Sequence, residues 1–152
     1  MWKIIVLCSA LFFPVASHAN SLFNYHFGYG AGLRYGLFSG FVPLLHINKN
    51  IDESVVFAEV ALSALVYGNV GYMRKVSEHS AISVSLLSGF AITTVFSGHK
   101  IGYLYNSNGF NKSGWETSIE LYSVDSQIDV ADENQPKTEH NWLPSISFGY
   151  HW

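Results

Sequence analysis

The stretch Trp142–Trp152 reads WLPSISFGYHW, and its alternation decides the class of fold. Every second residue from Trp142 to Trp152 is apolar or aromatic, whereas the residues between them, apart from Leu143, are small or polar. Neighbouring side chains of a strand point to opposite faces. The stretch therefore predicts a β-strand with one aromatic and aliphatic face and one face of Ser, Gly and His.

The stretch Tyr25–Tyr35 repeats this pattern near the other end of the chain. Apolar residues at odd positions alternate with glycines, His26 and Arg34 at even positions. Glycine on the inner face suits a narrow barrel, where interior space is short. Two such strands at the two ends of the chain can pair with each other and close a sheet.

Six further segments between these strands keep a period of two, the poorest of them containing Pro43. They are Leu37–Ile47, Ser54–Val66, Val70–Val76, Ala81–Ile92, Val95–Tyr105 and Trp115–Val124. Eight strands of ~10 residues use about 80 residues, which the chain can supply. The sequence thus predicts an all-β fold, an eight-stranded antiparallel up-and-down transmembrane β-barrel.

The connections also fit this topology. Asn48–Glu53, Ser77–Ser80 and Asn106–Gly114 would lie on the side of the two termini, in the periplasm. The longest connection, the acidic stretch Asp125–Asn141, would lie outside, as is usual for this class.

The composition fits a lipid-facing surface. Aromatic residues make up 16% of the chain and charged residues only 12%. No stretch after the N-terminus approaches the ~20 apolar residues of a helical span, so a membrane protein of this sequence would have to cross with closed strands. The formal net charge of −3 argues against a nucleic-acid partner.

The N-terminus predicts an export signal. Lys3 precedes the apolar run Ile4–Val15, and Ser17 and Ala19 occupy the positions that a signal peptidase requires. We expect a cleaved signal peptide at residues 1–19 and a single barrel domain at residues 20–152. The only cysteine, Cys8, would leave with the signal, so no disulfide can form.

The aromatic end of the last strand resembles the C-terminal signal of bacterial outer-membrane barrels, although their usual last residue is Phe rather than Trp. The architecture is similar to that of the small eight-stranded class that includes the OmpA transmembrane domain. This resemblance implies a Gram-negative outer membrane, with lipid and lipopolysaccharide as partners, and insertion by the barrel-assembly machinery through the last strand.

Alternation places most of the charges within the strands on the inner face. Charges at membrane depth are tolerated when they are paired or wet. We expect a polar network that fills the lumen, the alternative being a narrow channel. Its predicted members are His26, Arg34, Glu59, Lys75, Lys100, Glu116, Glu120 and His151.

One weak catalytic candidate is Ser107, in the segment Tyr105–Gly109. Ser107 and Asn108 resemble part of the His-x-Ser-Asn segment of the lipid A 3-O-deacylases, but Tyr105 stands where that family has its catalytic histidine. No metal or cofactor motif is present, because the histidines are scattered and the acidic stretch lacks EF-hand spacing.

The sequence favours a barrel with a structural or interaction role at the cell surface and no complete catalytic set. The alternatives are a lipid A-modifying enzyme, a narrow channel and a periplasmic binding barrel of the lipocalin type. The last alternative would reverse the two faces and place the aromatic residues around a ligand cavity.

Overall fold

The computed structural model describes residues 23–38, 43–91, 94–128 and 137–152. Over these ranges the fold is all-β, as predicted: eight long antiparallel strands form one sheet, with the short strand β2 beside β1. The predicted signal peptide, residues 1–19, lies outside the described residues. No helix in the described ranges has the length and apolarity needed to cross a bilayer.

In the described parts of the chain, nine strands and one short 3-10 helix, η2, follow one another. The elements are β1 Asn24–Gly32, η2 Leu33–Tyr35, β2 Leu37–Phe38, β3 Leu44–Ile51, β4 Ser54–Leu62, β5 Val66–Lys75, β6 Ser80–Ala91, β7 Thr94–Asn106, β8 Gly114–Ile128 and β9 Lys137–His151.

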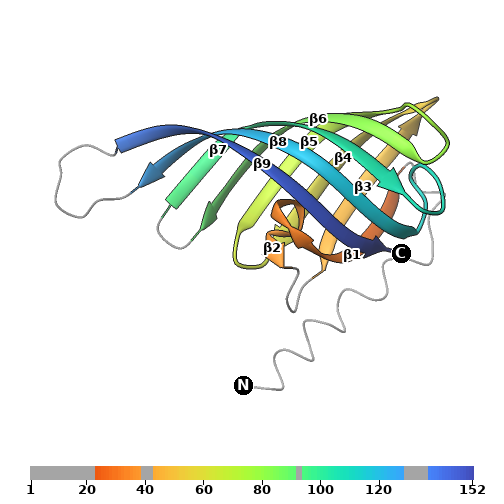
Figure 1. Cartoon of the computed structure of the whole chain (residues 1–152), viewed down its shortest axis with the longest axis horizontal. Coiled ribbons are helices and arrows are strands. Elements are labelled where there is room, and N and C mark those ends of the chain that lie inside the picture. Colours follow the sequence, from red (N-terminus) through yellow and green to blue (C-terminus); the bar gives the residue numbers. More distant parts are fainter. Residues whose placement is uncertain (1–22, 39–42, 92–93, 129–136) are drawn as a thin grey trace, which may run out of the picture.

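The sheet closes on itself. Pairing runs from β1 to β3 and then strand by strand to β9, and β9 returns to β1, which lies beside it in Figure 1. The closing register runs from Gly28 opposite His151 to Ala31 opposite Phe148. Next to the Gly28–His151 pair, the backbone groups of Phe27 and Trp152 exchange two hydrogen bonds of 3.0 and 3.1 Å. The predicted pairing of the first and last strands is therefore confirmed.

Three connections, two of them tight turns, meet at one end of the sheet, which we call the turn end. They follow β3, β5 and β7, and the C-terminus lies nearby (Figure 1). The Phe110 amide donates to the Glu78 carbonyl oxygen at 2.8 Å, and Asn111 Nδ2 donates to Asn48 Oδ1 at 2.9 Å. We call the opposite end the loop end.

The outer face is apolar and the inner face carries the polar groups. On β9 the alternate residues from Trp142 to Trp152 are exposed, while Ser147, Gly149 and His151 are buried. The predicted assignment of faces is thus confirmed, and the reversed assignment of a ligand-binding barrel is wrong for the described strands. Exposed apolar side chains on the other strands include Val56, Val60, Val70, Ile82, Val84, Leu86, Ile101, Ile119 and Leu121.

The end of β1 departs from the prediction. Alternation to Tyr35 would place Leu33 and Tyr35 on the outer face, but the strand ends at Gly32 and the chain turns into the interior. Tyr35 is consequently buried and Leu33 partly buried. Gly32 has φ 108° and Gly36 has φ 66°, values that favour glycine and that no alternation reveals.

Other predicted boundaries are wrong as well: the segment Ser54–Val66 ends early, because β4 stops at Leu62 and Val66 begins β5. In the segment Leu37–Ile47, residues 39–42 lie outside the described part, and β3 starts after Pro43, which cannot donate a ladder hydrogen bond, and continues beyond the predicted end to Ile51. The predicted long connection Asp125–Asn141 is mostly hairpin, since β8 and β9 pair as far as Ile128 opposite Lys137. Its residues 129–136 lie outside the described part.

The inner glycines leave room for large side chains. A Cβ on Gly28 would lie 2.8 Å from His151 Nε2, and a Cβ on Gly30 would lie 2.6 Å from the Tyr35 ring. The predicted use of glycine on the inner face therefore has a direct steric cause.

Replacing Gly149 with alanine is expected to lower the free energy of unfolding by about 1–3 kcal/mol, the usual cost of overpacking. Its Cβ would press on the Tyr35 ring and lie 2.5 Å from the Tyr29 carbonyl oxygen, at the closing register. Urea unfolding followed by circular dichroism measures the change. Gly68→Ala is the matched control, because the nearest atom to its Cβ is 3.8 Å away. An equal loss in both variants would contradict this explanation.

Candidate functional site

The interior is organised around Arg34, which enters it on η2. The turn is tied to β9 by two hydrogen bonds of 3.3 Å, from the Leu33 amide to Ser145 Oγ and from the Arg34 amide to Ser147 Oγ. The Tyr67 hydroxyl donates to the Arg34 carbonyl oxygen. The backbone around Arg34 is thus held from both β9 and β5 while its side chain points into the interior.

The Arg34 guanidinium joins two carboxylates that lie on opposite sides of the ring of strands. It forms ion pairs with Glu59 of β4 and Glu116 of β8, and its Nε lies 3.0 Å from Glu59 Oε1. In the order β1, β3 to β9, the strands β4 and β8 stand half a circumference apart. The fork of an arginine can satisfy two carboxylates at once, which a lysine cannot do with the same geometry.

A second cation, Lys100 of β7, extends these ion pairs. Its Nζ lies 2.8 Å from Glu120 Oε1 and 3.6 Å from Glu59 Oε2. The Tyr122 hydroxyl donates to Glu120 Oε2 at 2.8 Å, and Lys100 Nζ lies 5.6 Å from the centre of the Tyr122 ring. We call Arg34, Glu59, Lys100, Glu116 and Glu120 the interior network.

Histidine, asparagine and tyrosine side chains complete the contacts of the network. His46 Nδ1 lies 3.0 Å from Glu59 Oε1, and Asn69 Nδ2 donates to Glu59 Oε2 at 3.0 Å. The Tyr35 hydroxyl lies 2.9 Å from His151 Nε2. Both oxygens of Glu59 therefore have several partners, as a buried carboxylate requires.

The network contains two cations and three carboxylates, a near balance of charge in a narrow space. Burying such charges is costly unless they are paired, and removing one partner leaves the others uncompensated. The arrangement links η2, β4, β7 and β8 through the middle of the closed sheet. The ion pairs therefore connect these elements to one another across the interior.

The structure brings most of the predicted interior residues together. Arg34, Glu59, Lys100, Glu120 and His151 are buried, and His26 and Glu116 are partly buried. The interior position predicted for Lys75 is wrong: it pairs with the buried Ala81, but β5 ends there and its side chain is exposed.

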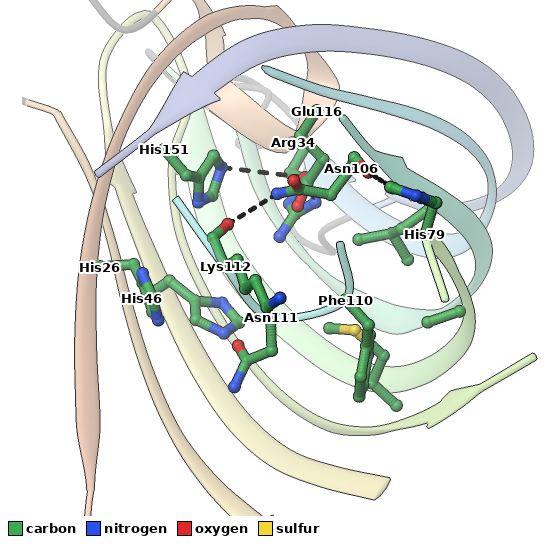
Figure 2. A pocket seen from close by; sticks show the side chains of 13 residues that line it. His26, Arg34, His46, His79, Asn106, Phe110, Asn111, Lys112, Glu116 and His151 are labelled. Carbon is green, nitrogen blue, oxygen red and sulfur yellow. Dashed lines mark hydrogen bonds and ion pairs between the residues drawn. The ribbon is translucent and has the colours of Figure 1, made fainter. Parts of the chain in front are cut away.

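Apolar residues fill the interior beyond the network. Toward the turn end, Val55, Phe57, Met73, Ala81 and Leu104 form a cluster against which Phe110 packs. Figure 2 shows Phe110, Asn111 and Lys112 at the mouth of this end, facing His26, His46 and His151. The cavity among them is about 30 Å³, so it has room for roughly one or two water molecules.

A larger cavity lies toward the loop end. It measures about 230 Å³, and most of its lining is apolar. The lining residues are Leu33, Leu65, Tyr67, Leu87, Thr94, Phe96, Tyr122, Val124, Ser126, Asn141 and Leu143.

Ser107, the weak catalytic candidate from the sequence, holds a turn. Its Oγ accepts a hydrogen bond from the Trp115 amide at 3.0 Å, closing the connection between β7 and β8. His79 stacks on Tyr105 with ring centres 5.9 Å apart, and its Nδ1 lies 3.0 Å from the Asn106 carbonyl oxygen. No histidine in the described ranges contacts the Ser107 hydroxyl, so the deacylase-like segment is not completed from elsewhere in the fold.

Sequence reasoning missed several residues of the polar core. His46 and Tyr122 both contact its carboxylates, and Tyr35 contacts His151. Tyr122 shares the inner face with Glu120, so alternation could have identified it. Tyr35 could not have been found in this way, because it reaches the interior on η2.

The two other histidines in the described ranges lie on the outer face toward the loop end. His99 of β7 and His140 of β9 both have their rings beside Trp142, with centroids 6.3 and 5.7 Å away. His140 also pairs with Asp125. No group of three or more His, Cys, Asp or Glu side chains suited to a metal ion occurs among the described residues. No protein-family model, curated protein or solved structure matches the chain.

Glu59→Gln is expected to lower the free energy of unfolding by about 3–5 kcal/mol, because it leaves Arg34 and Lys100 without a shared buried carboxylate. Chemical denaturation at constant ionic strength measures the loss. Glu53→Gln, at an exposed turn, is the control and should change stability by less than about 0.5 kcal/mol. A Glu59 variant as stable as this control would show that the network is not needed for stability.

Proposed function

We propose that the protein is a membrane-spanning β-barrel of a bacterial outer membrane, with a filled interior and a structural or interaction role at the cell surface. One observation carries the proposal: the closed sheet exposes its apolar residues and buries its charges. A soluble protein rarely exposes a continuous apolar surface of this kind. A closed sheet also leaves no unpaired edge that lipid would have to solvate.

The distribution of side chains on the outer face supports this proposal. Aliphatic residues such as Val84, Ile101 and Ile119 occupy the middle of the strands. Aromatic residues stand nearer the ends, among them Tyr105 and Trp115 toward the turn end. Others are Trp152, also toward the turn end, and Phe90 and Trp142 toward the loop end. An aliphatic band flanked by aromatic residues is typical of outer-membrane barrels.

The two ends suggest an orientation. Short turns face the periplasm in this class, and longer loops face outward. The turn end would then face the periplasm and the loop end would contact lipopolysaccharide or external partners. In this proposal β9 is also the strand that the barrel-assembly machinery engages.

The filled interior favours a non-conducting barrel over a narrow channel. The interior network links opposite strands, and apolar clusters lie on both sides of it. An eight-stranded barrel is just wide enough for side chains to fill. Ions would therefore need the buried pairs to separate before they could pass.

In a Gram-negative host, the protein is expected in the outer-membrane fraction, with a gel mobility that changes on boiling in SDS. A closed barrel resists SDS until it is heated, so the unheated sample runs as a compact species. A soluble band whose mobility does not depend on heating would refute the membrane proposal.

Purified protein in planar bilayers is expected to give no conductance steps above the leak of the lipid. The reason is the buried ion pairs across the middle of the interior. A known porin in the same bilayers is the positive control. Reproducible unitary steps from the unaltered protein would instead support the channel alternative.

A further inference from the structure

Three side chains on the outer face of β8 and β9 have the geometry of an activated serine. His140 Nδ1 lies 2.7 Å from Asp125 Oδ1, and His140 Nε2 lies 3.4 Å from Ser123 Oγ. One imidazole therefore links a carboxylate through one nitrogen and a hydroxyl through the other. This is the order of groups that makes a serine hydroxyl nucleophilic.

The pairing of the hairpin produces this arrangement. Asp125 is directly opposite His140, and Ser123, two residues earlier on β8, shares the outer face with Asp125. A residue at i and one at i+2 are neighbours on one face of a strand, so both can reach the same ring on the next strand. The described contacts of Asp125, His140 and Ser123 include none with the interior network.

Ser123 is unusually sheltered for the outer face. It is 2% exposed, whereas Leu121 on the same face is 39% exposed. Its two register partners are His99 of β7 and Trp142 of β9. The rings of these partners lie 6.3 Å apart, although strands on either side of β8 are separated by ~10 Å, so the rings lean toward each other over the serine.

We propose that Ser123, His140 and Asp125 form a hydrolytic site for the acyl esters of amphiphilic lipids. The lipid part of this inference rests on the proposed position in a membrane. In the reaction, Ser123 Oγ attacks the ester carbonyl carbon and its proton passes to His140 Nε2. The bond from that carbon to the alcohol oxygen then breaks, and the alcohol leaves with the proton.

Water completes the cycle. His140 takes a proton from water, whose oxygen attacks the acyl-serine, and the acid leaves as the proton returns to Ser123 Oγ. Asp125 acts through His140, as a positioning residue that keeps the ring in the tautomer with its proton on Nδ1.

The surroundings of the site determine the class of substrate. Toward the middle of the strands the outer face continues with Leu121, Ile101 and Ile119, all exposed and apolar. Toward the loop end it continues with polar side chains, Gln127 on β8 and Thr138 on β9. An amphiphile whose chain follows the apolar band and whose polar part reaches the loop end would bring its ester carbonyl to Ser123. Long-chain esters should therefore be preferred to acetate esters.

The test uses the full chain, purified and folded in detergent micelles, with p-nitrophenyl decanoate and p-nitrophenyl acetate as probes. Ser123→Ala and His140→Ala should each lower kcat/KM for the decanoate at least about 1,000-fold. A fluorophosphonate should modify Ser123, as identified by mass spectrometry, and should not do so in the His140→Ala variant.

Asp125 needs a readout that a merely structural role would not change. Asp125→Asn should lower kcat about 100-fold or more with little change in KM, and Asp125→Glu should recover part of the loss. Ser126→Ala is the matched control, because this serine lies on the same strand and bonds only to the Glu139 carbonyl oxygen at 3.3 Å among its described contacts. Its activity should equal that of the unaltered protein.

Heat-dependent gel mobility of each variant separates the two proposals. A protein that shows the mobility shift but neither hydrolyses the esters nor is labelled at Ser123 would overturn the hydrolytic site alone. Labelling at Ser107 instead of Ser123 would overturn it as well. Hydrolysis that requires Ser123, in a protein without the shift, would uphold the site and refute the membrane proposal.

Discussion

The structure depends on the burial of one guanidinium group. Arg34 links Glu59 and Glu116 on strands that stand half a circumference apart, so its ion pairs act across the closed sheet. Lys100, His46 and Asn69 also contact Glu59, and Lys100 pairs in addition with Glu120. Because each buried charge depends on the others, the strands that carry them must close in one register.

The inner and outer faces solve two different physical problems with the same alternation. Inside, glycine and serine leave volume for a few large side chains, and those side chains supply the charge pairs. Outside, aliphatic and aromatic residues cover the strands with little polar surface. A displacement of one residue along any strand would exchange the two faces and expose the charges.

Alternation alone predicted which face of β9, β4 and β6 would be buried, since a period of two can be read without knowing a partner strand. Alternation also predicted that Arg34 faces the interior, but for the wrong reason. Arg34 lies on η2 and not on a strand, and η2 depends on the positive φ of Gly32 and Gly36. The contact of His140 with Asp125 and Ser123 depends on the register of a hairpin between distant residues. The sequence around it lacks the apolar alternation that would have extended the two strands.

The ring of strands is not equally strong around its circumference. β1 pairs with β3 only from Asn24 to Gly28 and with β9 only from Gly28 to Ala31, whereas β8 and β9 pair along their whole length. A force that pulls β1 away from β3 or β9 is therefore opposed by only a few backbone hydrogen bonds. Two of the hydrogen bonds that oppose such a force join the backbone groups of Phe27 and Trp152, so Trp152 helps to hold the first and last strands together.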